Sequence, residues 1–356
     1  MRLADARVEA RQVRLTVPYR IAGRSYDAAE MLFVTLEDET GMRGYGAATP
    51  VEHVTGDTFE SAGHALTARI LPALRGADVS DLDDAVTRAR VASMSTRSAL
   101  AAFDIALHDL HAKRAGLPLH AWLGGIRRRL ITSVTIGIDD LDVMVAAARR
   151  HVERGFKALK VKIGEDADGD IERLNRIRDA VGPDIRIRVD ANEGYTVEQA
   201  ERIGRRLDEL GVELFEQPIS RHDLAGMWRV GKAMRAPVLA DEAVRVEGDL
   251  PALVEAGAAR GVNIKLMKCG GVSGARAIDR ALATVGWKAL VGCMDESRVS
   301  IAAAAHFAAA SASVEWVDLD GHFDLAEDPF TGGVELRDGE LVLSEEPGLG
   351  VSPAAG

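Results

Sequence analysis

The sequence feature that most constrains the fold is an alternation of short β-forming runs with helical stretches, which extends from residue 130 to residue 317. The β-forming runs are residues 130–135, 158–163, 185–189, 213–215, 238–240, 262–266, 288–291 and 314–317. Strands that alternate with helices form parallel sheets with right-handed crossovers, and eight such strands close economically into a (β/α)-barrel. No eighth helix is evident after the last run.

The rest of the chain predicts a second structural unit. Before the alternation, residues 8–17 and 31–37 have the composition of strands, and residues 61–74 and 96–115 have that of helices. We therefore expect an α+β capping domain over residues 1–125 and a modified TIM barrel over residues 126–320. Residues 321–356 are rich in Gly and Pro, and we expect them to return to the capping domain and complete it.

Composition excludes several classes of protein. The 356 residues are 47% hydrophobic and carry a formal net charge of −11, with both signs interspersed, so we expect no nucleic-acid partner. No apolar run reaches the roughly 18 residues of a membrane helix, and the N-terminal residues lack an apolar signal segment. The two cysteines, Cys269 and Cys293, are too few for a disulfide framework. We expect a cytoplasmic protein.

Carboxylates end three successive strands of the predicted barrel. They are Asp190, Glu216 and Asp241, and active-site residues of such barrels lie at the C-terminal ends of the strands. Oxygen ligands on rigid elements suit Mg²⁺. A substrate carboxylate bound to this ion has its charge neutralised as it becomes an enediolate. A lone acidic residue at a strand end usually caps a helix, but a series in metal-compatible order favours a catalytic site.

Lysines lie on the strands before and after these carboxylates. Lys160 and Lys162 are two residues apart and share a face of their strand, and Lys265 ends a strand across the barrel. Lysines on opposite sides of the mouth are placed to act as base and acid on the two faces of one carbon. A free lysine has a pKa of about 10.4, and we expect the metal and the second lysine to lower it.

The sequence resembles the enolase superfamily at these residues, most closely the dipeptide epimerases of its muconate-lactonising branch. The segments that carry the resemblance are Lys160-Val161-Lys162, Val189-Asp190-Ala191-Asn192, Glu216-Gln217-Pro218, Ala240-Asp241-Glu242 and the run from Asn263 to Gly271. The likeness extends over nearly the whole chain. The pair Asp318 and Asp320, on the eighth strand, is the feature that points to dipeptides.

The resemblance implies a role for each of these residues. Asp190, Glu216 and Asp241 bind Mg²⁺, Lys162 and Lys265 exchange the α-proton, and Lys160 assists at the substrate carboxylate. Asp318 and Asp320 hold the substrate ammonium, for which two carboxylates on one face are suited. The remaining residues expected to bind substrate are Arg24, Thr135, Cys293, Met294, Asp295 and Glu296.

The side chain that the site prefers is predicted from local charge. Asp295 adds a negative charge beside the expected pocket, and Glu52 and His53 lie in a second covering loop. An acidic pocket rejects glutamate and favours lysine or arginine. Arg24 favours glutamate instead, which leaves L-Ala-D/L-Glu epimerisation as an alternative.

Other functions remain open at this point. The same metal and lysines serve muconate or chloromuconate cycloisomerases and o-succinylbenzoate synthases, whose substrates carry no ammonium for Asp318 and Asp320. A catalytically silent binding protein on this fold would lack a ligand or a lysine, and none is missing. We therefore expect an isomerase, a Mg²⁺-dependent epimerase of small dipeptides, which forms a homo-oligomer with a number of subunits that the sequence leaves open.

Overall fold

The computed structural model describes residues 1–126 and 129–354. The N-terminal part begins with an antiparallel sheet of three strands, β1(Leu3–Ile21), β2(Arg24–Asp38) and β3(Arg43–Ala48). The helices that follow are α1(Glu52–Thr55), α2(Phe59–Ala65), the π-helical turn η1(Leu66–Ile70), α3(Leu71–Leu74), α4(Leu82–Ser93), α5(Arg97–Arg114) and α6(Leu119–Trp122). Helix α5 packs on β3, where Gly44 and Gly46 leave no room for a β-carbon against the α5 backbone. The sheet and helices thereby form the expected α+β cap.

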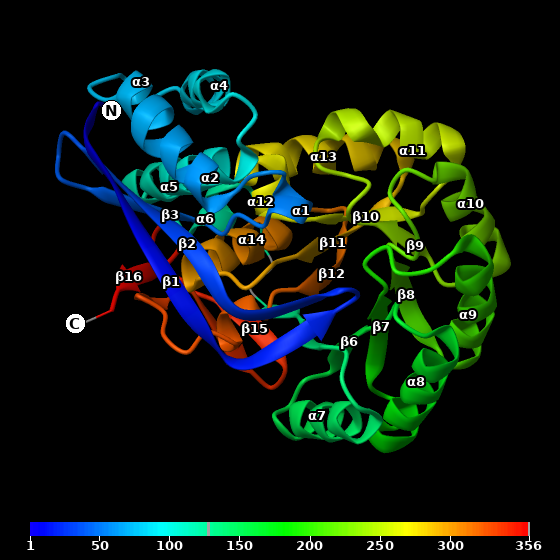
Figure 1. Ribbon diagram of the computed structural model, residues 1–356. Coiled ribbons are helices and arrows are strands. Elements are labelled where there is room, and N and C mark those ends of the chain that lie inside the picture. Colours follow the sequence, from blue (N-terminus) through cyan, green and yellow to red (C-terminus); the bar gives the residue numbers. More distant parts are fainter. Residues whose placement is uncertain (127–128, 355–356) are drawn as a thin grey trace.

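The hairpin of β1 and β2 reaches from the cap across to the barrel (Figure 1). Two groups of backbone hydrogen bonds hold it there. Thr16 N donates to Asp324 O at 2.7 Å, and Ile138 N donates to Arg20 O at 2.8 Å. Because these partners follow the last and first strands of the barrel, the hairpin covers the mouth between them.

The barrel is an eight-stranded parallel sheet in sequence order. Its strands are β5(Ser133–Ile136), β6(Ala158–Lys162), β7(Arg186–Asp190), β8(Val212–Glu216), β9(Val238–Ala240), β10(Gly261–Ile264), β11(Lys288–Gly292) and β12(Val314–Asp318). A parallel bridge between Thr132 and Val317 joins the first strand to the last, and Leu319 N donates to Thr132 Oγ1 at 2.9 Å. The predicted barrel is therefore confirmed.

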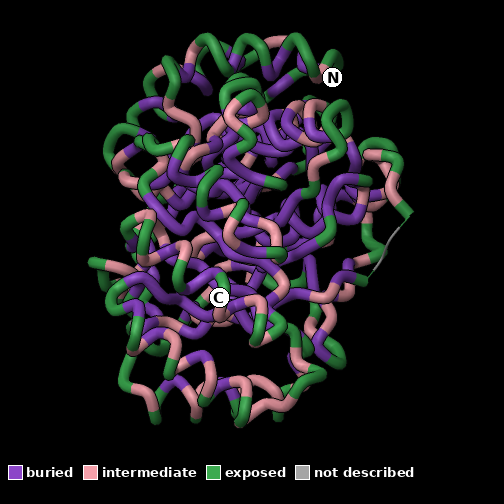
Figure 2. The backbone as a smooth tube through the Cα atoms, turned by 90° about the vertical axis from the view of Figure 1, so that its right-hand side faces the viewer, coloured by how far each residue is buried: buried purple, intermediate pink, exposed green. Residues whose placement is uncertain are grey.

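Helices cover the outside of the barrel (Figure 1). They are α7(Leu141–Glu153), α8(Ala167–Val181), α9(Val197–Glu209), α10(Leu224–Ala233), η2(Glu247–Asp249), α11(Leu250–Ala256), α13(Val272–Val285) and α14(Arg298–Ala310). The short buried helix α12(Leu266–Cys269) instead lies against α5 of the cap. Within the described residues β12 is followed by the 3-10 turn η3(Gly321–Phe323) and not by an eighth helix, as the sequence indicated. Buried residues gather in the interior of the molecule, and exposed residues lie on its outer turns (Figure 2).

The interior of the barrel is filled below the mouth. Leu214, Leu239, Leu290 and Trp316 form one buried cluster from four strands. Arg188 of β7 is also buried, and it donates to Val317 O at 2.7 Å and to Glu213 Oε2 at 2.9 Å. These side chains close the barrel as a packed core, so the polar site lies at the C-terminal ends of the strands.

The segment after η3 contacts two parts of the molecule. Its strands are β13(Phe330–Gly332), β14(Val334–Arg337), β15(Glu340–Leu343) and β16(Val351–Pro353). Phe330 packs on Phe33 and Tyr45 of the cap sheet, with ring centroids 5.5 and 5.2 Å apart. Strand β15 pairs with β4(Arg129–Ile131), so residues 130–135 are not one strand as expected, because β4 leaves the barrel to join this antiparallel sheet.

No helix among the described residues is long and apolar enough to cross a membrane.

Candidate active site

The register of the barrel strands brings the predicted site residues to one level. Lys162 pairs with Asp190 across β6 and β7, and Asp190 pairs with Glu216 across β7 and β8. Glu216 pairs with Leu239, two residues before Asp241. Alternate residues of a strand share a face, so Lys160 and Lys162 both enter the polar end of the barrel.

The three carboxylates converge. Each of Asp190, Glu216 and Asp241 offers an oxygen, and these oxygens lie within 4.8 Å of one another. All three side chains are fully buried. Burial, followed by the charge of Asp190, raises the pKa of Glu216 to about 7. Buried acids at this spacing repel one another, and a cation relieves that repulsion.

The arrangement fits a magnesium ion. Opposite ligands of an octahedral Mg²⁺ lie about 4.2 Å apart, twice the Mg–O distance of about 2.1 Å, so three oxygens that all lie within 4.8 Å of one another are close enough to share one ion. Within the described residues, the buried Glu242 Oε2 beside the cluster accepts no hydrogen bond, and Glu216 Oε2 has only an ion pair, with Lys160 Nζ at 2.9 Å. A hard cation suits such oxygen donors, so the residues present match the metal expected from the sequence.

The lysines form ion pairs with the carboxylates. Lys162 Nζ lies 2.7 Å from Asp190 Oδ2, and Lys265 Nζ lies 2.8 Å from Asp241 Oδ2. Despite burial, the charge of Asp241 raises the pKa of Lys265, and Asp318 and Glu216 raise that of Lys160. This is the opposite of the direction expected for a base, because in the protein alone the carboxylate charges outweigh those of neighbouring lysines.

Lys268 is a part of the site that sequence reasoning missed. Its Nζ forms an ion pair with Asp241 Oδ1 and donates to Asp241 O at 2.6 Å and to Asn263 O at 3.0 Å. Although burial opposes them, Lys265 and Lys268 hold the pKa of Asp241 well below its usual range. The strand was expected to continue to residue 266, but it ends at Ile264, and the short helix α12 turns Lys268 back toward Asp241.

Amides also bind the carboxylates. Asn263 Nδ2 donates to Glu216 Oε1 at 2.6 Å, and Asn192 Nδ2 donates to Glu242 Oε1 at 3.2 Å. Asn192 Oδ1 accepts from Lys162 at 3.0 Å. Both asparagines lie within the sequence segments that resemble the enolase superfamily, and this resemblance is the feature of the sequence from which their role could have been inferred.

The two aspartates at the end of β12 have different partners. Asp318 accepts from Lys160 Nζ at 2.9 Å and Ser133 Oγ at 2.6 Å. Asp320 Oδ2 accepts from Thr135 N at 2.6 Å, and its Oδ1 accepts from the Cys293 thiol, with Sγ 3.7 Å away. Burial, followed by the charge of Asp318, raises the pKa of Asp320 to about 6. Of the carboxylate oxygens of Asp318 and Asp320, Asp320 Oδ1 therefore has the weakest hydrogen-bond donor.

Two chambers meet at the lysines. The first, of about 320 Å³, is bounded by Thr135, Lys160, Asp318 and Asp320 and by the β1 hairpin. The second, of about 260 Å³, is bounded by Lys265, Asn192 and cap residues that include Tyr26 and His53. Lys162, Cys293, Met294 and Asp295 line both chambers. The first chamber thus holds the candidate ammonium site, and the second opens from the space between the two lysines.

Three expected residues lie differently. Glu296 is buried and accepts from Met294 N at 2.9 Å, so it braces the loop after β11. Glu52 and Arg24 are exposed, and neither is among the described residues that line the two chambers. His53 does line the second chamber, and Tyr26 Oη lies 3.4 Å from its Nε2. Burial lowers the pKa of His53 to about 4, so this covering group is neutral.

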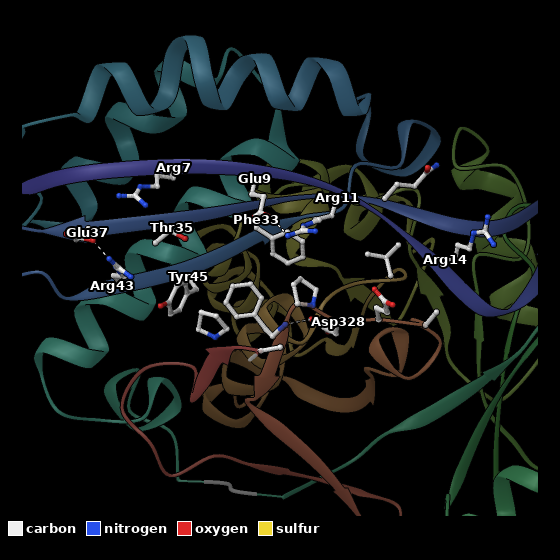
Figure 3. Close-up of a pocket in the computed structure, with 18 of the residues that line it drawn as sticks. Arg7, Glu9, Arg11, Arg14, Phe33, Thr35, Glu37, Arg43, Tyr45 and Asp328 are labelled. Atoms are coloured by element: carbon white, nitrogen blue, oxygen red, sulfur yellow. Dashed lines mark hydrogen bonds and ion pairs between the residues drawn. The ribbon is translucent and has the colours of Figure 1, made fainter. Parts of the chain in front are cut away.

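A separate cavity of about 930 Å³ lies between the cap sheet and the segment after η3 (Figure 3). Alternating charges such as Arg7, Glu9 and Arg11 line it, together with Phe33 and Tyr45. None of the described lysines and carboxylates at the barrel mouth contributes to it, so it is distinct from the candidate site.

Comparisons with known proteins agree with this geometry. Residues 3–124 match the family model of the mandelate racemase / muconate lactonizing enzyme N-terminal domain, and residues 143–355 match the enolase C-terminal domain-like model. The L-Lys-D/L-Arg epimerase of Methylococcus capsulatus is 42% identical over 99% of both chains. The L-Ala-D/L-Glu epimerase of Bacillus subtilis is 36% identical over 96% of this chain and 94% of its own. The solved dipeptide epimerase of Methylococcus capsulatus, complexed with Mg and L-Arg-D-Lys, superposes with a TM-score of 0.95 at 42% identity, covering 99% of both chains.

Proposed function

Because this chain belongs to the mandelate racemase / muconate lactonizing enzyme family of the enolase superfamily, we propose that it is a magnesium-dependent epimerase of dipeptides. It inverts the α-carbon of the second residue. Relatives that span the whole chain carry out this class of reaction. The reaction requires a bound carboxylate, two proton-transfer groups and a partner for the dipeptide's ammonium.

One observation carries the proposal. Lys162 and Lys265 stand on opposite sides of the carboxylate cluster, paired with Asp190 and Asp241 respectively. Mg²⁺ held by Asp190, Glu216 and Asp241 would supply positive charge at the substrate carboxylate. A carbon held between the two ammonium groups has one lysine at each face.

The lysines transfer the proton. One Nζ removes the α-proton as a base, and the other Nζ returns a proton to the opposite face as an acid. Each lysine must lose its proton before it acts as a base, so the ion pairs with Asp190 and Asp241 must loosen when substrate binds. Lys160, between the carboxylates and Asp318, binds the substrate carboxylate.

The first chamber positions the amino terminus of the dipeptide. Asp320 Oδ1 accepts from the ammonium, and Asp318 stands behind it with its charge already compensated by Lys160. Thr135 fixes Asp320 through its backbone N–H. Cys293, Met294 and Asp295 separate this end of the dipeptide from the second side chain.

We propose a cationic side chain on the second residue. Asp295 lines the second chamber, and Glu30 stands at the same chamber's cap side. The exposed Arg24 lines neither chamber, which favours this preference over glutamate. A homo-oligomer and a cytoplasmic location stay predictions.

The test is a dipeptide library incubated with the protein and Mg²⁺ in D₂O, read by mass spectrometry for deuterium uptake and by chiral analysis for inversion. The wild type should incorporate one deuterium and invert the second residue, and EDTA should abolish both. Lys265→Ala should lose inversion and retain exchange of the one stereoisomer whose proton faces Lys162. Inversion at the wild-type rate by Lys265→Ala would refute the two-lysine scheme.

A further inference from the structure

The first chamber extends well beyond the candidate ammonium site. It continues from Asp320 outward between the β1 hairpin and α7. Its walls on the α7 side are apolar and include Val143, Met144 and Ala147, and Phe323 of η3 adds an aromatic surface. A dipeptide's ammonium alone does not fill about 320 Å³, so the chamber has room for a side chain.

Asp324 stands in this chamber and has no role in the proposed chemistry. Its backbone oxygen accepts from Thr16 N at 2.7 Å and from Thr16 Oγ1 at 3.2 Å, which fixes the residue against the β1 hairpin. Across the described chain, its carboxylate forms no hydrogen bond or ion pair. Burial, then the charges of Asp320 and Asp295, raise the pKa of Asp324 to about 7. A half-buried carboxylate beside other acids, without a partner, is stabilised by a cation that enters the chamber.

We propose that Asp324 selects a long cationic side chain, lysine or arginine, on the first residue of the dipeptide. The inference rests on the proposed function, which places the second residue's α-carbon between Lys162 and Lys265 and the ammonium at Asp320. The first side chain leaves the carbon that bears this ammonium, and the first chamber is the space adjoining it. The apolar wall of α7 accommodates the hydrocarbon stem, and Asp324 meets the charged end.

Three arginines also line the chamber, Arg20 of β1, Arg150 of α7 and Arg154 just after α7. Arg150 and Arg154 are exposed, and the guanidinium of Arg154 lies 5.5 Å from the Phe156 ring centroid. Water and salt screen these exposed charges more than that of the half-buried Asp324, and burial and the neighbouring acids outweigh the lowering effect of Arg154 on the pKa of Asp324. The alternative is a dipeptide with an acidic first residue, whose side chain these arginines would bind.

The experiment varies only the first residue. We would measure kcat/KM for L-Lys-L-Arg, L-Met-L-Arg and L-Glu-L-Arg, because methionine matches the apolar stem of lysine and lacks the ammonium group. The wild type should prefer lysine to methionine by about tenfold, the size of one partly screened ion pair. Asp324→Asn should reduce this ratio to about twofold or less. The control is Glu327→Gln, a matched loss of charge three residues along, at an exposed site that lines the separate cavity.

The outcomes are separable. A wild type that prefers methionine or glutamate, an Asp324→Asn ratio equal to the wild type's, or an equal effect of Glu327→Gln each overturns the role of Asp324. Any of these results with inversion of the second residue intact leaves the epimerase function standing. Absence of deuterium uptake with every dipeptide removes both proposals together.

Discussion

Lys160 Nζ lies 2.9 Å from Asp318 Oδ2 and 2.9 Å from Glu216 Oε2, so one buried lysine joins the end of β12 to the cluster of Asp190, Glu216 and Asp241. The charge of Asp318 is therefore already paired in the protein alone. Asp320 follows two residues later, and its Oδ1 accepts from the weak thiol donor of Cys293. The two aspartates look equivalent in the sequence, but their contacts differ. Asp318 pairs with Lys160, and Asp320 is the residue that we propose binds the ammonium.

Acetylation of the dipeptide's amino group should remove most of the activity. The acetyl group eliminates the charge that Asp320 accepts, and a lost charged hydrogen bond is worth about 1.5–3 kcal/mol. We expect kcat/KM to fall by about 10- to 100-fold, measured on free and N-acetylated forms of one dipeptide. Asp320→Asn should lose discrimination between the two forms. Equal kcat/KM for both substrates with the wild type would favour the cycloisomerase alternative.

The pH dependence follows from the same residue. The pKa of Asp320 is raised from 3.8 to about 6, so its carboxylate is charged above that pH and neutral below it. The dipeptide's ammonium loses its proton near pH 8. At saturating Mg²⁺, kcat/KM should be greatest between about pH 6 and 8 and fall about tenfold per pH unit below 6. Asp320→Asn should lower the maximum of kcat/KM and flatten its decline below pH 6. If the decline is unchanged in this variant, another group causes it.

The barrel and the convergence of its three carboxylates were predictable from the sequence because both depend on short-range patterns. Alternation of strand and helix fixes the order of parallel strands, and the register of neighbouring strands then aligns residues at their ends. Asp190 and Glu216 pair directly in the observed sheet, which is why their positions in the sequence were sufficient. The confirmed magnesium fit follows from this alignment.

Lys268 shows what such patterns miss. Its role depends on β10 ending at Ile264 and on the helical turn α12, which local composition did not distinguish from a longer strand. Likewise, residues 130–135 read as one strand, but pairing of β4 with β15, distant in the sequence, divides them. In both cases a tertiary contact decides where a strand ends.

Lys268→Met should destabilise the fold. The substitution leaves the fully buried Asp241 with one fewer cation, and removing one member of a buried pair costs about 3–5 kcal/mol. Because Lys265 still pairs with Asp241, we expect about 3 kcal/mol at the lower end of that range. The measurement is the urea midpoint of the metal-free protein.

A matched control is the exposed pair of Arg337 and Glu335. Arg337→Met should cost less than about 1 kcal/mol, because water screens an exposed pair. Equal shifts of the urea midpoint for the two variants would show that Lys268 contributes no more than a surface charge.

The charges expected around the second side chain also needed the structure. Glu52 and His53 are adjacent, yet Glu52 is exposed on α1 while His53 lines the second chamber. One residue's difference in a short helix reverses which side chain faces inward. Arg24, at the start of β2, is exposed beside the hairpin turn. Of the two carboxylates weighed from the sequence, Asp295 lines the chamber and Glu52 does not.

Asp295→Ile should therefore shift preference at the second residue away from cations. A lysine or arginine within about 4 Å of one partly exposed carboxylate gains on the order of 1–4 kcal/mol before desolvation, and a glutamate is repelled by a similar amount. We expect the ratio of kcat/KM for L-Ala-L-Lys to that for L-Ala-L-Glu to exceed one in the wild type and to fall about tenfold in Asp295→Ile. The control is Glu52→Gln, which removes an exposed charge outside both chambers and should leave the ratio within about twofold. A wild type that prefers the glutamate dipeptide would identify Arg24 as the reader, because its side chain would then have to turn inward from its exposed position when substrate binds.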